Sequence, residues 1–423
     1  MANFHLFFFL HKITDLIVFG EEVIIFYTSN VDGYLKACNC PGNLFGGLIY
    51  ADEVIKNVKD TNDNVIVIDG GDLFPSKNWI PKANYVIKLY NHIGLDIINI
   101  GDQEFQFGFD YLKEKGNEAK FDFVSANIRK NGKLVFKPFL IKKIGSLKIG
   151  IIGYADPHVF YSMNMKDIDV IPADKSLPPI IKEIAHKCDF LILLSHSGME
   201  KDKILAKAFP EIDLILGAHS EILSHKPKKI NKTYIIHSGS FAHYLLKITL
   251  SKSSANKKKI TYESIKLEGI PISRSVQKIY ESYLQSSDEL TIAASEKLKS
   301  KPHNYKKAPS ADDCGACHFD EYSQWLKTSH AKAWHTIEED GRTQDISCIA
   351  CHTTLYQKDK GFVSLELTPE LTNVTCVSCH IDYEGHPDQK ESFQSVKEEL
   401  CRVSLKSICN KLKFRKFLVN YFP

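Results

Sequence analysis

Short apolar runs alternate with amphipathic stretches between about residues 22 and 270. The runs that predict strands are residues 23–27, 65–68, 97–100, 121–124, 149–152, 190–194, 212–216 and 234–237. Helical spacing of apolar residues occurs in the stretches 48–58, 85–93 and 201–208. Buried runs that alternate with amphipathic helices predict an α/β layered domain with much parallel sheet. Two later runs, 244–251 and 259–267, predict strands separated by the polar turn 252–258.

The pattern changes after Pro271. Residues 275–298 predict one long, mostly polar helix that serves as a linker or a docking helix, and Pro302 and Pro309 follow it. The region beyond this helix is polar and rich in loops, with few strand or helix signals. A chain of 423 residues is long enough for two or three domains, and the change in pattern separates at least two.

Three copies of the spacing Cys-x-x-Cys-His lie within this polar region. They are Cys314-Gly-Ala-Cys317-His318, Cys348-Ile-Ala-Cys351-His352 and Cys376-Val-Ser-Cys379-His380. Two thiols at this spacing add to the two vinyl groups of one haem, and the histidine that follows becomes an axial ligand of its iron. Zinc knuckles and disulfide pairs are the alternatives, but zinc needs two such pairs on one metal, and neither explains the repeated histidine. The spacing therefore predicts three c-type haems. The haems, in place of apolar side chains, would fill the core of this polar region.

Histidines outside the signatures are candidates for the sixth ligand of each iron. His330 and His335 follow the first signature, His386 follows the third, and His303 precedes the first. The alternative for each is a surface or packing histidine. An iron with two imidazole ligands is closed to substrate and favours electron transfer, whereas an iron with one has room for a small ligand.

Composition and charge are those of an ordinary soluble globular protein. Hydrophobic residues make up 43% and charged residues 25% of the chain. A net charge of +3 is too small to indicate binding to a nucleic acid polymer or to a membrane surface.

Eleven cysteines are present, and six of them belong to the signatures. The other five are Cys38, Cys40, Cys188, Cys401 and Cys409, and an odd remainder argues against a simple disulfide scaffold. Cys38 and Cys40 stand one residue apart in the loop after the first predicted strand. They are a redox pair, additional soft metal ligands, or two ordinary loop cysteines. The haem region on the same chain favours a redox or metal role.

The N-terminal segment, residues 1–21, contains an apolar run at residues 4–10. Haem is attached to c-type cytochromes outside the cytoplasm, so we expect a periplasmic or otherwise extracytoplasmic location and an export signal. No Lys or Arg precedes the run, and no small-residue cleavage site follows it before Glu21, so the signal is imperfect. No segment of the chain is long and apolar enough to predict a transmembrane helix.

Polar side chains follow several of the predicted strands. They are Asn30 and Asp32 and the segments 69–72, 101–104, 195–198 and 217–221. The carboxyl ends of strands form the ligand-binding crevice of open α/β sheets, and carboxylate, amide and imidazole groups there suit one or two divalent metals. Any one of these residues alone is more readily explained as a cap or turn residue. That explanation fits the whole ordered set less well.

The order of these polar motifs resembles that of the calcineurin-like metallophosphoesterases, in particular the branch related to 5′-nucleotidases. The matching motifs are Thr28-Ser29-Asn30-Val31-Asp32-Gly33, Gly46-Gly47-Leu48, Gly71-Asp72, Gly101-Asp102-Gln103-Glu104, Ser195-His196-Ser197-Gly198 and Ala218-His219-Ser220-Glu221. Over about residues 22–270 the resemblance implies a four-layer sandwich with two mixed sheets between helices. It also implies a metal-bridging Asp72, a second-metal set of Asp102, His196 and His219, and a first-metal set of Asn30, Asp32 and Glu221.

The first-metal positions lack the imidazoles of the family. Asn30, Asp32 and Glu221 all offer oxygen, which favours a harder cation or none. Gln103 stands where the family has a catalytic histidine, and glutamine cannot deliver a proton near neutral pH. A two-metal hydrolase needs a metal-activated water and charge stabilisation on both sides of the phosphorus, so these departures argue against efficient 5′-nucleotidase activity.

The region 311–388 resembles the multihaem cytochromes related to the bacterial tetrahaem cytochrome that accepts electrons during ammonia oxidation. The resemblance rests on the three signatures, the segment Ser329-His330-Ala331, the run His352-Thr353-Thr354 and the histidine that follows the third signature. It implies that His330 and His386 are distal ligands. The family commonly has a further signature downstream, which Cys401 and Cys409 do not form, so the number of intact signatures stays at three.

These patterns divide the chain into an N-terminal apolar segment (1–21), a metallophosphoesterase-like domain (22–270), a helical linker (271–303), a multihaem cytochrome c domain (304–390) and an atypical tail (391–423). The expected fold class is α/β, a four-layer sandwich followed by a loop-rich, mostly α-helical haem domain. The leading hypothesis is an extracytoplasmic cytochrome that exchanges electrons with a redox partner protein. The alternatives are a metal-dependent hydrolase of a phosphorylated small molecule with an appended electron-transfer module, and a docking scaffold without chemistry.

Overall fold

The computed structural model describes residues 19–38, 44–76, 79–163, 165–299, 307–356 and 358–380. Predicted features outside these residues are the apolar run of the export segment, Cys40, His303, His386, Cys401, Cys409 and the tail 391–423.

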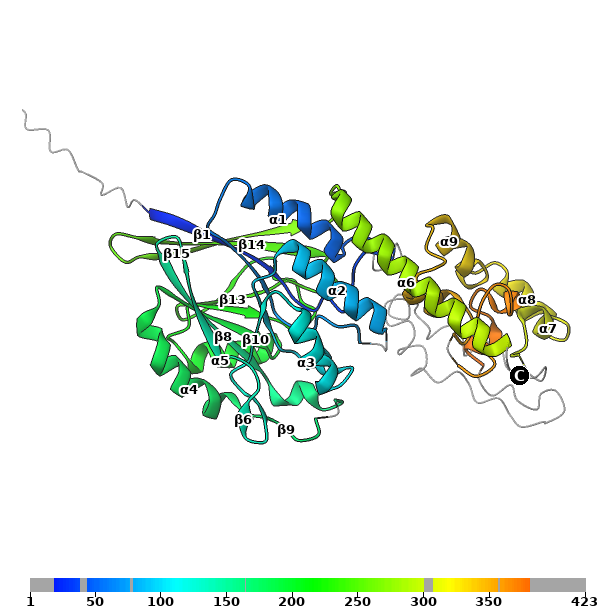
Figure 1. Ribbon diagram of the computed structural model, residues 1–423, viewed down its shortest axis with the longest axis horizontal. Coiled ribbons are helices and arrows are strands. Elements are labelled where there is room, and N and C mark those ends of the chain that lie inside the picture. The colour runs from blue at the N-terminus through cyan, green and yellow to red at the C-terminus, as the bar shows by residue number, and fades with distance from the viewer. Residues whose placement is uncertain are drawn as a thin grey trace, which may run out of the picture.

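The first of two six-stranded sheets has the strand order β15-β14-β1-β2-β3-β4 (Figure 1). Its strands are β1 (Phe19–Thr28), β2 (Val65–Asp69), β3 (Ile97–Asn99), β4 (Asp122–Val124), β14 (Tyr244–Ser253) and β15 (Lys258–Lys266). From β1 to β4 neighbouring strands are parallel, whereas β14 is antiparallel to β1 and β15 is antiparallel to β14.

The second sheet has the order β12-β13-β11-β10-β8-β7. Its strands are β7 (Phe139–Ile144), β8 (Leu147–Ala155), β10 (Phe190–His196), β11 (Leu214–Gly217), β12 (Lys228–Ile230) and β13 (Thr233–His237). The four central strands are parallel, and β7 and β12 pair antiparallel to their neighbours at the two edges. Both sheets are therefore mixed, as predicted.

β1 shows why the predicted strands read as continuous apolar runs. Val23, Ile25 and Tyr27 pack in the cluster between the two sheets, whereas Ile24 and Phe26 pack in the cluster beneath the helices. A strand with both faces covered has no position at which a polar side chain reaches water. Its side chains point alternately to the two faces, so consecutive residues are all apolar.

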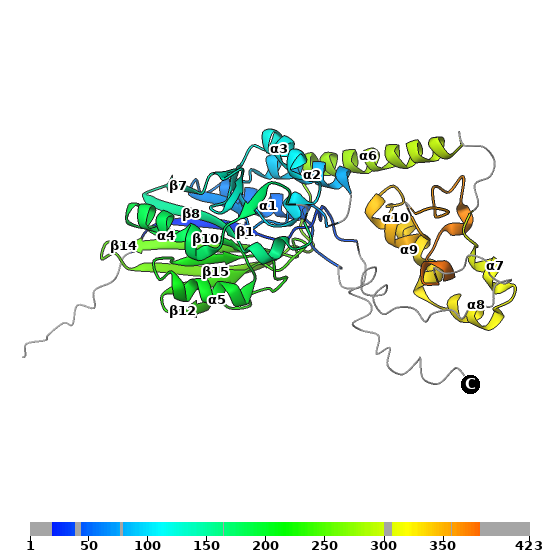
Figure 2. The same ribbon diagram turned by 90° about the horizontal axis from the view of Figure 1, so that it is seen from below.

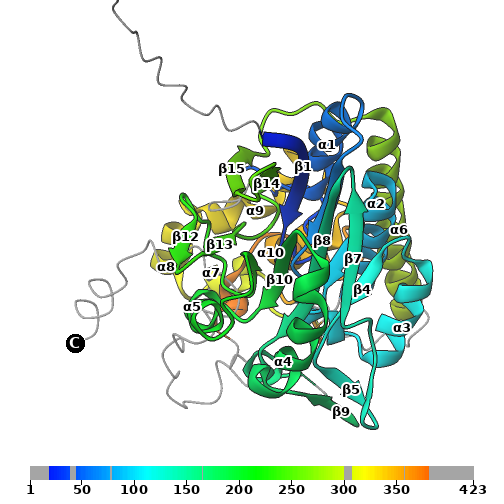
Figure 3. The same ribbon diagram turned by 90° about the vertical axis from the view of Figure 1, so that its left-hand side faces the viewer.

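Helices cover the outer face of each sheet (Figure 3). The first sheet carries α1 (Ala51–Lys59), α2 (Ile80–Ile93), α3 (Phe109–Glu118) and the start of α6 (Arg274–Lys299), and the second carries α4 (Ala173–Ile184) and α5 (Met199–Ala208). The predicted four-layer sandwich of helices, sheet, sheet and helices is confirmed.

Several elements were not predicted from the pattern, and each has a physical reason. Edge strand β7 carries Lys142 and Lys143, and its side chains alternate between exposed and half-buried positions. Helix α4 contains Pro178 and Pro179, which ordinarily disfavour a helix interior. Buried side chains on one face of α4 compensate. The remaining unpredicted elements are α3, β12 and a three-stranded sheet of β5 (Ile128–Lys130), β6 (Lys133–Leu134) and β9 (Ile168–Val170).

Helix α6 joins the sandwich to the C-terminal region. Its first half buries Val276, Tyr280 and Tyr283 in the same cluster as α2, and its second half extends away from the sandwich (Figures 1 and 2). The described residues of the region that follows form four short α-helices, α7 (Ala311–Gly315), α8 (Phe319–Trp325), α9 (Ala333–Glu339) and α10 (Ile346–His352), and three 3-10 helices. No helix within the described ranges is long and apolar enough to cross a membrane.

Candidate functional site

Four polar side chains meet where the carboxyl ends of both sheets come together. Asp72 follows β2, Asp102 follows β3, His196 ends β10 and His219 follows β11. One ligand atom from each lies within 4.8 Å of the others, so the four surround a common point. This grouping is the one that parallel strands produce when their carboxyl ends lie at one edge.

Distances within this group are those of a compact ligand set. His196 Nε2 lies 3.2 Å from Asp72 Oδ2 and 3.3 Å from Asp102 Oδ1, and His219 Nδ1 lies 3.4 Å from Asp102 Oδ1. The other ring nitrogen of His196, Nδ1, donates to the carbonyl of Gly70 at 3.1 Å. That hydrogen bond fixes the tautomer, so that the lone pair of Nε2 faces the carboxylates.

The four residues fit a divalent cation. His196 Nε2 and Asp102 Oδ1 are buried and have no hydrogen-bond partner, although they are close to each other. Gly101 leaves the space that they need, because a Cβ atom there would lie 2.5 Å from Asp72 Oδ1. Two carboxylates and two imidazoles suit zinc and the neighbouring first-row metals.

Electrostatics at the group favour the charged carboxylates. Burial would raise the pKa of Asp102, but the neighbouring imidazoles of His196 and His219 lower it well below its usual range. Burial would lower the pKa of His196, but Asp72 and Asp102 raise it well above its usual value. The carboxylates are therefore held in the charged form, and a cation that binds here would displace the proton that the raised pKa places on His196.

Glu104 is a positioning residue whose role was not predicted from the sequence. Its buried carboxylate accepts hydrogen bonds from the backbone N–H groups of Gly101 at 2.7 Å, Leu73 at 2.6 Å and Asp72 at 3.1 Å. Burial and the nearby Asp72 raise the pKa of Glu104 to about 8. The side chain thus ties the loop after β2 to the loop after β3, which carries Asp102.

A second network that was not predicted supports the loop of His219. His237 Nε2 lies 2.8 Å from Asp202 Oδ2, and both side chains are fully buried. The other ring nitrogen of His237 lies 3.1 Å from Ser220 Oγ, and Asp202 also accepts a 2.5 Å hydrogen bond from Ser195. His237 ends an ordinary buried strand and Asp202 lies on an ordinary helix, so neither stood out in the sequence.

The residues predicted for a first metal do not join this group. Asn30 Oδ1 accepts the backbone N–H of His219 at 2.9 Å, and its Nδ2 donates to Gly239 at 2.9 Å. Asp32 accepts the backbone N–H of Ser76 at 2.5 Å, and burial raises the pKa of its carboxyl to about 6. Glu221 is exposed. Within the described ranges, the metal-type group holds neither Asp32 nor Glu221.

Gln103 begins the short helix η2 (Gln103–Phe105) beside the group. Its backbone N–H donates to Asp72 Oδ1 at 3.0 Å, and its side-chain Oε1 is buried without a hydrogen-bond partner. The residue therefore helps to hold Asp72. It stands where the family that the sequence resembles has a catalytic histidine.

The second signature lies on α10 and has the geometry of a haem-binding motif. His352 Nδ1 lies 2.5 Å from the carbonyl of Ala333 and 3.1 Å from Thr336 Oγ1, so it donates to the carbonyl and leaves the lone pair of Nε2 for iron. Cys348 is buried and Cys351 is exposed. The residues of this signature therefore fit a covalently bound haem.

The first and third signatures are neighbours in space. Cys314 lies on α7, which begins with a capping box between Ser310 and Asp313, and Cys376 lies on η7 (Cys376–Ser378). Burial and the nearby Cys376 thiol raise the pKa of Cys314 to about 11. All six signature cysteines, including Cys317 and Cys379, are free thiols, so none of them is taken up by a disulfide.

The candidate distal histidines differ in their surroundings. His330 lies on η5 (Ser329–Lys332), and its carbonyl accepts the N–H of Val374 at 3.2 Å, close to the third signature. Burial lowers the pKa of His330, which favours the neutral imidazole that binds iron. His335 is exposed on α9 and forms ion pairs with Glu338 and Glu339. The signature histidines His318 and His380 lie within the described residues.

A family model for cytochrome c554 and c-prime matches residues 313–381. The N-terminal part is similar to curated 5′-nucleotidases. The human 5′-nucleotidase is 27% identical over 219 residues, which cover 47% of this chain and 38% of that protein. A snake venom 5′-nucleotidase from Naja atra is 26% identical over 224 residues, covering 47% of this chain and 41% of that protein. The matches thus span about two fifths of these relatives.

Solved structures share the fold of the sandwich. The sulfate thiohydrolase SoxB of Thermus thermophilus, in complex with glycerol, superposes with a TM-score of 0.57 at 18% identity, covering 62% of this chain and 60% of that chain. The calcineurin-like phosphoesterase YfkN of Bacillus subtilis gives a TM-score of 0.55 at 20% identity, covering 63% and 97%. The chain therefore joins a part with calcineurin-like phosphoesterase and 5′-nucleotidase homologues to a region matched by a cytochrome c family.

Proposed function

We propose that this chain is an extracytoplasmic multihaem cytochrome that carries electrons, fused to a metallophosphoesterase-like domain with altered metal ligands. The observation that carries the proposal is the second signature, where two free thiols precede a histidine whose Nδ1 is fixed and whose Nε2 is left for iron. The nearness of Cys314 and Cys376 supports two haems close enough to exchange electrons. Haem supplies the one-electron chemistry, and the chain supplies the thioether and imidazole attachments.

A redox protein is the expected partner, and a location outside the cytoplasm follows from the covalent attachment of haem. The curated snake venom 5′-nucleotidases that match the sandwich support the same location.

Haem content tests this proposal directly. The full chain is produced with an export signal in a host that attaches haem to c-type cytochromes, and its pyridine haemochrome spectrum is compared with protein concentration. Three covalent haems per chain are expected, and mass spectrometry should place them at the three signatures. Protein that is colourless after such production contradicts the proposal.

In the sandwich we propose a site for a single divalent cation, held by Asp72, Asp102, His196 and His219. When bound, a cation supplies Lewis acidity and lowers the pKa of bound water. The residues of the chain position it: Gly70 fixes the imidazole of His196, Glu104 fixes the loops of the two carboxylates, and Asn30 fixes the backbone of His219.

A second candidate function is hydrolysis of a phosphorylated small molecule at that cation. The four-residue group favours it, because it brings four ligand-type side chains together and one of them, His219, is exposed to solvent. Metal analysis and assays with a generic phosphomonoester and phosphodiester test it. Turnover that requires a divalent cation and is lost in His196→Ala and Asp72→Asn, but not in the exposed Glu221→Gln, supports hydrolysis. No turnover with any divalent cation rejects it.

A further inference from the structure

Three buried side chains join the second haem signature to the sandwich. Arg342 donates to the carbonyl of Ala37, in the loop after β1, at 2.5 Å, and to Asp345 Oδ2 at 2.6 Å. Tyr283 of α6 donates to the other oxygen of Asp345 at 2.7 Å. All three side chains are buried, so this junction is a packed interface and not a contact between surface charges.

Asp345 also begins the helix that carries the second signature. It is the N-cap of α10, and its Oδ1 accepts from Ser347 N at 3.0 Å and from Ser347 Oγ at 2.6 Å. The carboxylate that accepts the hydrogen bond from Tyr283 therefore also fixes the start of α10. Cys348 directly follows Ser347 on that helix. Cys348 is 4% exposed, whereas Cys351 of the same signature is exposed. The thioether at Cys348 would hold one edge of the haem at the junction.

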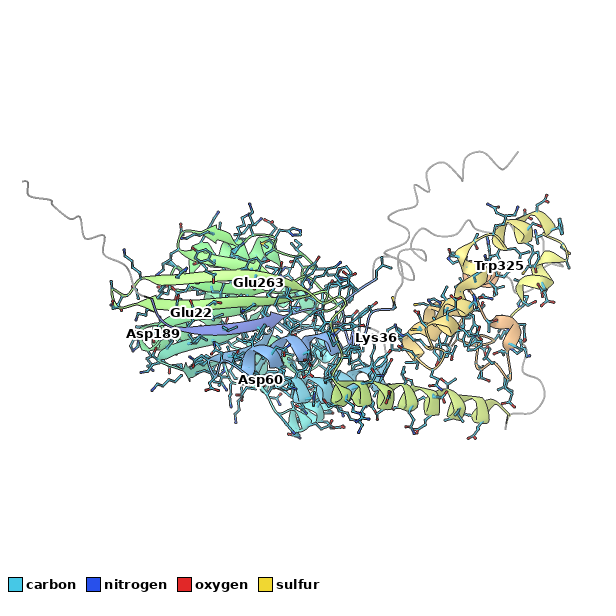
Figure 4. All side chains as sticks on the ribbon, turned by 90° about the horizontal axis from the view of Figure 1, so that it is seen from above. Glu22, Lys36, Asp60, Asp189, Glu263 and Trp325 are labelled. Atoms are coloured by element: carbon cyan, nitrogen blue, oxygen red, sulfur yellow. The ribbon has the colours of Figure 1, made fainter. Side chains whose placement is uncertain are left out.

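On the sandwich side, the junction meets the loop that contains Cys38. Cys38 is disulfide-bonded, and it directly follows Ala37, whose carbonyl Arg342 holds. The hydroxyl of Tyr34 donates to Cys38 Sγ at 3.7 Å. Lys36 from the same loop lies at the end of the sandwich that faces the C-terminal region, in which Trp325 lies (Figure 4).

Tyr34 lies between the two groups. Its ring centroid lies 4.6 Å from that of Phe241, with the two rings tilted by 42°, and the ammonium of the buried Lys82 lies 4.8 Å from the Tyr34 ring centroid. Burial raises the pKa of Tyr34 above its ordinary value, and the nearby Arg342 guanidinium opposes that rise, while Cys348 is also among its titratable neighbours. A half-buried aromatic side chain thus lies between the surroundings of Cys348 and the sulfur of Cys38.

We propose that the disulfide at Cys38 is an electron acceptor for the haem held at Cys348 and Cys351, so that the chain has a thiol–disulfide redox centre at this junction. The inference rests on the proposed binding of haem and goes beyond it, because it assigns the acceptor. Of the three interpretations of Cys38 from the sequence, it takes the redox one, since a sulfur in a disulfide is not a thiolate ligand.

The reaction balances with two haem electrons. The S–S bond at Cys38 breaks, takes up two electrons and two protons from solvent, and leaves two thiols. The electrons arrive one at a time as two ferrous haem irons become ferric. A reduced redox partner protein restores the ferrous state, and dithionite replaces that partner in the test.

An anaerobic reductive titration tests the proposal on the full, haem-loaded chain. Dithionite is added while the haem α-band is followed, thiols are then alkylated, and peptide mass spectrometry locates the alkylated cysteines. The wild type should take up two reducing equivalents more than Cys38→Ser, and Cys38 should become alkylated only after the haems are reduced. Cys188, a free thiol, should react in both states and serves as the internal reference.

Equal uptake by the two haem-loaded proteins overturns the proposal. If Cys38→Ser does not fold, the wild type alone decides the test. A Cys38 that stays unalkylated in the fully reduced wild type also overturns the proposal. Absence of an α-band instead rejects the proposed binding of haem, so the two failures are distinguishable.

A docking variant tests which haem is the donor. In Arg342→Gln the thiol at Cys38 should appear at least about tenfold more slowly, because loss of a buried ion-pair partner weakens docking by more than the ~1.4 kcal/mol that corresponds to a factor of ten. Arg129→Gln, which removes an arginine from the distant strand β5, should keep the wild-type rate. An unchanged rate in Arg342→Gln overturns the assignment of this haem as the donor.

Discussion

The sandwich buries three clusters of apolar side chains, whereas the region of residues 307–380 buries one cluster of eight residues around Trp334 and Phe362. Strands of the sandwich are covered on both faces, and the helices of the haem region have five or seven residues each. The first part is thus filled by its own side chains. The second needs another apolar body to fill it, which is the role that covalent haems would take.

Withholding haem should have the largest effect. A single small cluster supplies at most about 3–5 kcal/mol in a region of this size, so residues 307–380 should lose their ordered structure while the sandwich keeps its cooperative transition. Hydrogen exchange followed by mass spectrometry should show peptides of α7 to α10 unprotected and those of β1 and β10 protected. Slow exchange in α10 without haem would contradict this contrast.

A cavity in the sandwich should have the opposite effect: it should destabilise the sandwich and not the region of residues 307–380. Phe26 is fully buried on β1, so Phe26→Ala should lower the free energy of unfolding of the sandwich by about 3–5 kcal/mol. Denaturant unfolding followed by far-ultraviolet circular dichroism measures this change. Tyr161→Ala, at a residue 90% exposed, is the matched control and should change stability by about 0.5 kcal/mol or less. Similar losses in both variants would refute the contrast between interior and surface.

The junction between the two parts should depend on Asp345. Replacement by Asn keeps the helix cap but leaves Arg342 without its buried partner, so docking should weaken by about 3 kcal/mol. Small-angle X-ray scattering should show a larger radius of gyration for Asp345→Asn than for wild type. An unchanged radius would show that other contacts hold the junction.

Acid should have the same effect on the wild type. Burial would raise the pKa of Asp345, but Arg342 and Lys82 hold it well below its usual range. A carboxyl whose folded-state pKa is depressed stabilises docking above its unfolded pKa of about 4, and this contribution is lost as pH falls below that value. The scattering radius of the wild type should therefore increase below about pH 4, and that of Asp345→Asn should not respond to this group.

The metal group of the sandwich should bind without haem, with the smallest of these effects on mutation. His219 is partly exposed, so His219→Ala should leave the fold intact and lower the affinity for a divalent cation at least about tenfold, or ~1.4 kcal/mol. Competition with a chromophoric chelator measures the affinity. Glu221→Ala should bind as the wild type does, and an equal loss there would reveal a second cation.

Prediction from sequence succeeded where one physical requirement acts on consecutive residues. Buried strands were readable because both faces are covered. The grouping of Asp72, Asp102, His196 and His219 in space was readable because strand ends meet at one edge, and their role as metal ligands stays a prediction. Edge strand β7, with its exposed lysines, and helix α4, with its two prolines, lack such a local signal.

Roles that depend on distant partners were not readable. Glu104 and His237 look ordinary until the loops that they hold are brought together. Asn30 was predicted only as a metal ligand, and its amide also bonds the backbone of residues more than 180 positions away. The same holds for Arg342, whose partner Ala37 lies 305 positions before it.

The burial of Cys348 has a consequence for how the protein is made. A ligation enzyme must reach both thiols of a signature and the haem together, and the Cys348 thiol is buried in the cluster around Trp334 and Phe362. If the proposed haem is attached there, its attachment would have to precede the folding of that cluster. The proposed assembly then has a fixed sequence of events: the haem would be joined to a still open segment, and that segment would then fold and dock on the sandwich.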